Sequence, residues 1–299
     1  MSGVLWAALV IVASALQTAR FVLQKVLSGS GLSVGGATFS RFLFGAPIAL
    51  AAATALLLGT SEALPDLTPR FWGFMLAGGA AQIFRHVSHG RCSSCAISPW
   101  SRRLYQDRNV SGRAVFGADP GRAGGTPGLA GDHDRLWRRD VDVAPARGGR
   151  MLSRPMVYGL LAGAGFAVAA IGYRGATVEL EPLPFLIRAM VALAAATSSQ
   201  TLGMALYLRV FEPGELSRVV AAWRRTIWVG VTGVGGSAGW FAAFALQNAA
   251  YVRAFGQIEM VFTLLASVWF FGERLHRREG AGIALVVASL VALVLAGRG

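Results

Sequence analysis

Residues Leu183–Val210 read LPFLIRAMVALAAATSSQTLGMALYLRV, an apolar segment in which the charged residues, Arg188 and Arg209, lie toward the two ends. A helix of about 20 apolar residues is long enough to cross the hydrocarbon core of a bilayer. It also satisfies every backbone N–H and C=O group within itself, as a segment surrounded by lipid must. Leu183–Val210 is therefore predicted to be a membrane-spanning helix.

Further apolar segments lie on both sides of this one, and together they predict about eight spans. Overall, 54% of the residues are hydrophobic and 14% are charged, whereas about 25% are charged in an ordinary soluble domain. The predicted fold class is an all-α polytopic membrane protein. The other predicted spans are Val4–Leu27, Arg41–Gly59, Phe71–Phe84, Met156–Ala176, Ile227–Ala250, Tyr251–Phe271 and Gly280–Ala296.

The formal charge of +13 is concentrated in one segment. Of the 28 basic residues, 12 lie between Arg85 and Arg150, together with both cysteines. Residues 85–150 show neither helical nor strand periodicity, and a loop of this length is unusual inside a compact domain. The chain thus divides into first-half membrane helices over 1–84, an anomalous segment over 85–150 and a second set of helices over 151–299.

The anomalous segment has the composition of GC-rich DNA read out of frame, since arginine outnumbers lysine 27 to 1 in this chain. With two bases dropped, the codons of Ser94–Arg103 permit LRNFAVVAA, and with one base dropped, the codons from Leu104 onward permit YTKTE. The frame would therefore have slipped more than once, and the joined string is LRNFAVVAAYTKTE. That string aligns without a gap to LQNAAYVRAFGQIE, which is Leu246–Glu259, and such self-similarity indicates an internal repeat. We therefore interpret residues 85–150 as frameshifted, and we expect them to be disordered.

The string FALQNAAYVRAFGQIEMVFT, Phe244–Thr263, and the Gly272-Glu273 pair that follows it resemble the EamA-like transporters of the drug/metabolite transporter superfamily. The resemblance covers Val4–Phe84 and, more fully, Met156–Ala296. It implies two inverted halves of five helices, ten spans in the intact protein.

Carriers of this superfamily move amino acids, small metabolites or drugs, commonly outward. The resemblance therefore implies an alternating-access exporter of the bacterial inner membrane, coupled to protons or to the membrane potential. It implies no enzyme activity and no cofactor. The expected partners are the lipid bilayer and a small-molecule substrate, without nucleic acid, and a homodimer is left open.

Charged groups inside membrane spans are costly, so each one is a candidate site residue. Glu259 lies about eight residues into the predicted span Tyr251–Phe271. We expect it to couple transport to an ion or to contact the substrate. The alternative is a permanent ion pair with Arg253 or Arg174 that only holds helices together.

Other polar residues in or near the spans are further candidates for substrate contact. Gln17 and Arg20 share one face of the first span with Gln24, although the glutamines could equally form hydrogen bonds between helices. Aromatic residues near span ends are more often interface anchors than substrate contacts. The remaining candidates are Tyr173, Arg174, Gln247, Asn248, Tyr251 and Gln257, with Trp240 near them.

Three sequence features have a structural interpretation. The cations Lys25, Arg41 and Arg188, near span ends, are expected to extend to lipid headgroups. Gly230, Gly233, Gly235, Gly236 and Gly239 are expected to allow close helix packing. Residues Glu215–Arg225 are expected to form an amphipathic surface helix through Leu216, Val219, Val220 and Trp223.

No metal site is predicted. His86, His89, Cys92 and Cys95 could supply a tetrahedral zinc site, but they are spaced more tightly than most such sites and lie inside the anomalous segment.

Basic residues at Arg150, Arg154, Arg209–Arg225 and Arg274–Arg278 alternate with an acidic loop near Glu179 and Glu181. The positive-inside rule places the basic loops in the cytoplasm and, with this span count, both termini outside. Two other functions fit the sequence. Residues 85–150 could form the binding module of a membrane-anchored protein, or the chain could be the nonfunctional product of a decayed gene.

Overall fold

The computed structural model describes residues 2–28, 32–91, 154–271 and 277–296, and in these ranges every regular element is a helix. The predicted all-α class is confirmed. Most of the anomalous segment, including the predicted frameshift, lies outside the described residues.

The first half contributes α1 (Ser2–Ser28), α2 (Val34–Thr60) and α3 (Pro69–Arg91). Helix α2 begins well before the predicted Arg41 because Ser33 caps it, with the Ser33 hydroxyl accepting a hydrogen bond from the Gly36 N–H at 2.9 Å. Helix α3 continues past the predicted end at Phe84, so its last turns fall within the segment that composition sets apart.

The second set of helices covers the predicted spans with two changes. The span predicted over Tyr251–Phe271 is two helices, separated at Gly256 and Gln257. The predicted surface helix is also shorter, because Trp223 starts the next helix rather than extending this one. The elements are α7 (Arg154–Val178), α8 (Phe185–Phe211), α9 (Glu215–Ala221), α10 (Trp223–Leu246), α11 (Ala249–Phe255), α12 (Ile258–Phe271) and α13 (Arg277–Ala296).

The chain between α11 and α12 packs closely on α10. Gly256 lies directly against Trp240, so that a Cβ at this position would be 2.5 Å from the indole ring. Asn248 starts α11 by accepting a hydrogen bond from the Ala250 N–H at 2.9 Å. Glu259 therefore lies in the first turn of α12, and not in the middle of a continuous helix.

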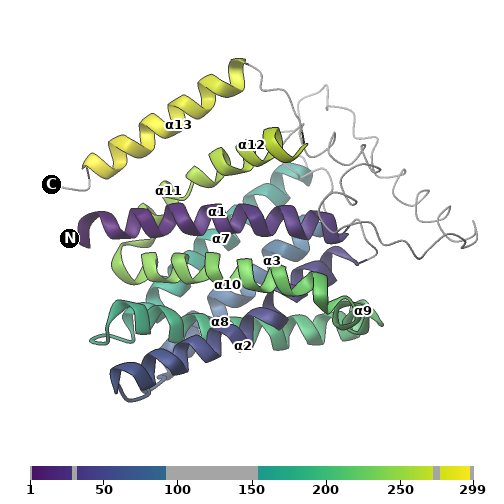
Figure 1. Cartoon of the computed structure of the whole chain (residues 1–299), viewed down its shortest axis with the longest axis vertical. Helices are drawn as coiled ribbons and strands as arrows, with labels where there is room; N and C mark the ends of the chain where they lie inside the picture. The colour runs from purple at the N-terminus through teal and green to yellow at the C-terminus, as the bar shows by residue number, and fades with distance from the viewer. Residues whose placement is uncertain (1, 29–31, 92–153, 272–276, 297–299) are drawn as a thin grey trace, which may run out of the picture.

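The two sets of helices interleave, as Figure 1 shows. Helix α1 packs on α10 and α12, α2 packs on α8 and α10, and α3 packs on α7 and α8. The first three helices make few contacts with one another. The fold of the first half thus depends on the second half.

Glycines set the closest of these approaches, as predicted for α10. A Cβ at Gly239 would lie 2.8 Å from the Ala13 Cβ on α1, and one at Gly230 would lie 2.5 Å from the Phe44 Cβ on α2. Gly172 allows a similarly close approach of α7 to α3, since a Cβ there would lie 2.6 Å from the Phe74 carbonyl oxygen. Small residues permit close contact between helices where lipid supplies no hydrophobic driving force.

A buried carboxylate joins the α8–α9 turn to the start of α2. Glu215 is fully buried, accepts a hydrogen bond from the Ser33 N–H at 2.6 Å and pairs with Arg218 at 2.7 Å. The neighbouring Glu212 accepts a hydrogen bond from the Ser33 hydroxyl. Negative charge is favourable at a helix N-terminus, so both glutamates stabilise this junction.

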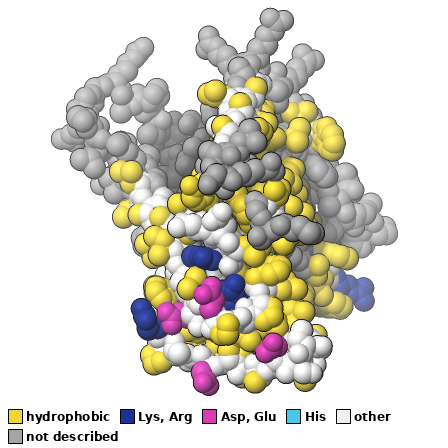
Figure 2. All heavy atoms as spheres, turned by 90° about the vertical axis from the view of Figure 1, so that its left-hand side faces the viewer, with side chains coloured by type: hydrophobic (Ala, Val, Ile, Leu, Met, Phe, Trp, Pro, Cys, Tyr) yellow, Lys and Arg dark blue, Asp and Glu magenta, His cyan; other side chains and the backbone are white. Residues whose placement is uncertain are grey.

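Within the described residues, four helices are long and apolar enough to cross a membrane: Val4–Gln24, Val34–Thr60, Phe185–Phe211 and Trp223–Leu246. Their outward faces carry large apolar side chains such as Leu58, Leu202 and Trp228. Figure 2 shows one side of the molecule, with charged side chains gathered in its lower part among apolar ones. The chain is an integral membrane protein.

Candidate functional site: a polar cavity between the two sets of helices

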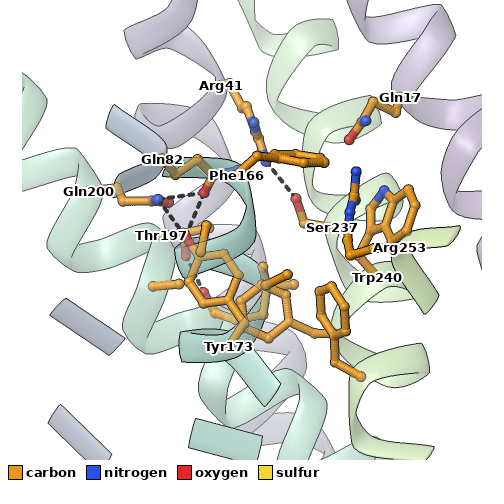
Figure 3. A pocket seen from close by; sticks show the side chains of 16 residues that line it. Gln17, Arg41, Gln82, Phe166, Tyr173, Thr197, Gln200, Ser237, Trp240 and Arg253 are labelled. Atoms are coloured by element: carbon orange, nitrogen blue, oxygen red, sulfur yellow. Dashed lines mark hydrogen bonds between the residues drawn. The ribbon is translucent and has the colours of Figure 1, made fainter. Parts of the chain in front are cut away.

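A cavity lies where the two sets of helices meet. Its empty volume is about 590 Å³, which includes the open space at its mouth. Helices α1, α2, α3, α7, α8, α10 and α11 all contribute to its wall (Figure 3). The lining residues are Gln17, Arg41, Gln82, Phe166, Ala169, Ala170, Tyr173, Leu193, Ala196, Thr197, Gln200, Ser237, Trp240, Phe241, Phe244 and Arg253.

One wall is a closed set of hydrogen bonds between three helices. The Tyr173 hydroxyl donates to Gln82 Oε1 at 2.5 Å, and Gln200 Nε2 lies 2.7 Å from the same oxygen and 2.9 Å from the Tyr173 hydroxyl. Tyr173 and Gln200 are buried. Buried polar groups require such partners, so this triad fixes the side chains of α3, α7 and α8 relative to one another.

Another part of the wall carries positive charge. The guanidinium of Arg253 lies between two aromatic rings, 3.5 Å from the centroid of Phe166 and 4.7 Å from that of Trp240. Arg41 is buried and donates from Nη2 to the Ser237 hydroxyl at 2.9 Å. Both arginines line the cavity, and Figure 3 shows Arg41, Gln17 and Arg253 around the same space.

Gln17 connects the cavity to the carboxylate that the sequence singles out. Its Nε2 donates to Glu259 Oε2 at 2.6 Å, although Glu259 itself is not among the lining residues. The structure thus joins two predicted site residues that are far apart in the sequence. Of the predicted candidates, Gln17, Tyr173 and Arg253 line the cavity, as does Trp240.

The other predicted candidates lie elsewhere. Arg174 donates from Nη1 to the Phe244 carbonyl oxygen and so joins α7 to α10. Buried Arg20 donates to Gln24, one turn further along α1, at 2.8 Å. Asn248 caps α11, and Gln247 accepts a hydrogen bond from the Asn248 N–H at 2.8 Å. Tyr251 and Gln257 are exposed.

The expectation that end-of-helix arginines extend to headgroups is wrong for two of them. Arg41 lines the cavity, as described above. Arg188 is buried, pairs with Glu181 at 2.6 Å and donates to the Thr177 carbonyl oxygen at 3.5 Å. Burial between helices replaces the lipid interface for both side chains. The side chain of Lys25 lies outside the described residues.

Sequence reasoning missed several lining residues, namely Phe166, Gln82, Thr197, Gln200 and Ser237. A signal for two of them was present, because Thr197 and Gln200 belong to the polar run TSSQT inside the apolar segment quoted first. Polar side chains within a span usually face the interior of the bundle.

The described residues hold no group of three or more His, Cys, Asp or Glu side chains placed to bind a metal ion. The set His86, His89, Cys92 and Cys95 reaches beyond the described part of the chain, so the structure does not test it.

Comparison with known protein families now adds to this geometry. Residues 153–295 match the model of the EamA-like transporter family. This part of the chain is similar to the EamA-like transporters. The match confirms the resemblance predicted from Phe244–Thr263. No curated protein and no solved structure significantly matches the chain.

The EamA-like half supplies α7 to α13, and hence most of the cavity wall, including Tyr173, Gln200 and Arg253. The family consists of transporters and not of enzymes. Together with the apolar helices, the match identifies a membrane transporter in general terms.

Proposed function

We propose that this protein is a carrier of the bacterial inner membrane that moves a small solute, in the export direction, by alternating access through the cavity. The observation that carries the proposal is the position of the cavity, which is partly polar in its lining and built from both sets of helices inside an apolar bundle. Carriers made of two repeats bind their substrates at such interfaces.

The pairing of helices supports two inverted halves. If α1, α2 and α3 correspond to α7, α8 and α10, then the contact of α1 with α10 corresponds to that of α7 with α3. The contact of α2 with α8 corresponds to itself and lies on the symmetry axis. Both crossed contacts are among the most extensive in the described structure, as this correspondence requires.

Helices α11 and α12 form a discontinuous segment beside the cavity, a feature that carriers use at ion and substrate sites. Glu259 in the first turn of α12 is held by Gln17, which lines the cavity. We infer that Glu259 couples solute movement to protons. A change in the charge of Glu259 would alter its hydrogen bond to Gln17, and Gln17 lines the cavity.

The two ends of the bundle differ in charge. Helix α8 crosses the bundle from the end with Glu179 and Glu181 to the end with Arg209 and α9 (Figure 1). The basic end, at Arg209, Arg218 and Arg224, is proposed to face the cytoplasm. The N-terminus then lies outside.

Cysteine labelling in membrane vesicles tests alternating access without knowledge of the solute. In the full chain with Cys92 and Cys95 replaced by Ser, Thr197→Cys places a thiol in the cavity wall. A membrane-impermeant maleimide should label it both in right-side-out and in inside-out vesicles, because a carrier opens its site to each side in turn.

Ala189→Cys is the matched control, since Ala189 lies on the same helix, is fully buried and does not line the cavity. It should resist the reagent in both kinds of vesicle. Labelling of Thr197→Cys from one side only would indicate a fixed pocket and contradict alternating access.

A further inference from the structure

We propose that the solute is a small organic anion, with a carboxylate held by Arg253 and Arg41 and an apolar, ring-sized body held by the aromatic side chains of the cavity. The inference deepens the proposed function by naming the substrate class, and it rests on that function.

The first step is the charge of the cavity. Its lining among the described residues includes the two arginines Arg41 and Arg253 and no aspartate or glutamate. A cation inside a membrane protein is costly, and such residues usually mark a path or site for a charged partner. Two guanidinium groups on one small space favour an anion there and repel a cation.

The second step is the surroundings of Arg253. Its guanidinium carbon lies over Phe166 and Trp240 at 3.5 Å and 4.7 Å from the ring centroids. A guanidinium that stacks on aromatic rings does so with its faces, while its N–H donors lie along the edge. A carboxylate fits that edge with two parallel hydrogen bonds, which a single-point acceptor does not.

The third step is the second cation. Arg41 comes from α2, in the first half, and donates to Ser237 on α10 at 2.9 Å. Arg253 comes from α11 in the EamA-like half. An anion that contacts both arginines would therefore bridge the two sets of helices, which is the position where binding can affect their relative movement.

The fourth step is the apolar body of the solute. Phe166, Trp240, Phe241 and Phe244 line the same cavity, and the Tyr173 ring lies 4.7 Å from the Phe241 ring. Aromatic rings stack favourably on one another in offset or tilted arrangements. The lining thus favours an apolar ring or branched group joined to the anionic head.

The experiment compares three probes that share a phenyl ring: phenylacetate, phenethylamine and 2-phenylethanol. Binding to the full chain in lipid nanodiscs is measured by calorimetric titration. Phenylacetate should bind at least about tenfold more tightly than either of the others, the factor expected for a charge-assisted hydrogen bond. Equal or tighter binding of the amine or the alcohol, or no binding of phenylacetate at millimolar concentration, overturns the anion assignment.

Variants assign the charge to named residues. Arg253→Gln and Arg41→Gln should each weaken phenylacetate binding about tenfold or more, and Arg253→Lys should retain part of it. Arg70→Gln is the control, because Arg70 is exposed and pairs with Glu179 away from the cavity. Unchanged binding in both glutamine variants rejects the site. Arg253→Glu should transfer the preference to phenethylamine, a gain that an unfolded variant would not show.

Proteoliposomes separate this inference from the proposed function. Phenylacetate that binds but crosses no faster than in protein-free liposomes contradicts the carrier and leaves the anion site intact. Flux of phenethylamine in place of phenylacetate supports the carrier and overturns the anion assignment. Flux of phenylacetate that Arg253→Gln abolishes supports both.

Discussion

Gln17 on α1 donates a hydrogen bond to Glu259 on α12, with 2.6 Å between Nε2 and Oε2. Only Gln17 of the two lines the cavity. The Gln17 amide therefore lies between the Glu259 carboxylate and the cavity. Because α1 belongs to the first half and α12 to the EamA-like half, the contact also ties the two together.

A double-mutant cycle measures this contact. Gln17→Ala and Glu259→Ala should be non-additive, with a coupling free energy of about 1–3 kcal/mol, because a hydrogen bond to a charged group is stronger than a neutral one. The free energy of unfolding in a denaturing detergent titration provides the measurement. Thr263→Ala serves as control, since its hydroxyl bonds the Glu259 backbone carbonyl at 2.8 Å. Combined with Gln17→Ala it should be additive, and additivity in the test pair would contradict the coupling.

Removal of the Glu259 charge should uncouple transport. In proteoliposomes with an imposed proton gradient, Glu259→Gln is expected to carry phenylacetate at a rate that no longer depends on the gradient. The amide keeps the shape and hydrogen-bonding capacity of the side chain but cannot exchange a proton. Glu62→Gln, at an exposed position, should keep the dependence of the original chain. Full gradient dependence in Glu259→Gln would rule out the coupling role.

The triad of Tyr173, Gln82 and Gln200 should respond to loss of a single oxygen. Tyr173→Phe removes the hydroxyl that donates to Gln82 and lies 2.9 Å from Gln200 Nε2. We expect a loss of about 1–3 kcal/mol in unfolding free energy, since buried amides lose a partner. Tyr207→Phe on α8 is the matched control, because the ring contact of Tyr207 with Phe211 survives the change. A similar small effect in both variants would show that the triad contributes little.

The glycine contacts predict a position-dependent effect of one substitution. Gly239→Val and Gly172→Val should each destabilise the protein by about 1–3 kcal/mol, because the added atoms overlap α1 and α3 respectively. Gly73→Val should be tolerated, since no atom lies within 4 Å of a Cβ there. Melting temperatures in one detergent compare the three. If Gly73→Val proved as harmful as Gly239→Val, helix propensity and not close packing would be the cause.

The sequence predicted most helices because apolar runs are long and helices must satisfy their own backbone in lipid. It did not predict the break before α12, at Gly256 and Gln257, where Gly256 packs closely on Trp240 of α10. It also placed Arg41 and Arg188 at the membrane surface. Their burial depends on neighbours that only the tertiary structure supplies.

The cavity, too, was predictable from the sequence only in part. Polar residues inside an apolar run, such as Gln17, were identifiable, because their cost in lipid is a property of the residue type. Asn248 and Gln257 were equally polar, yet one caps a helix and the other lies in a turn. Which polar side chains converge on one space depends on helix rotation, and composition does not determine that.

The last prediction concerns the reading frame. In the described structure α1 packs on α12, and under the proposed symmetry α7 would pack on a fourth helix of the first half. The shifted string LRNFAVVAAYTKTE is the sequence expected for that helix, since it aligns to Leu246–Glu259, which runs from the end of α10 through α11 into α12.

Sequencing of the genomic DNA that encodes residues 80–155 should reveal small insertions or losses of bases that restore this string and the two missing spans. The restored carrier would then have its repeat complete. A confirmed frame in an expressed gene would contradict the ten-helix prediction, because residues 85–150 would then be a genuine part of the protein and the fourth helix would be absent from it.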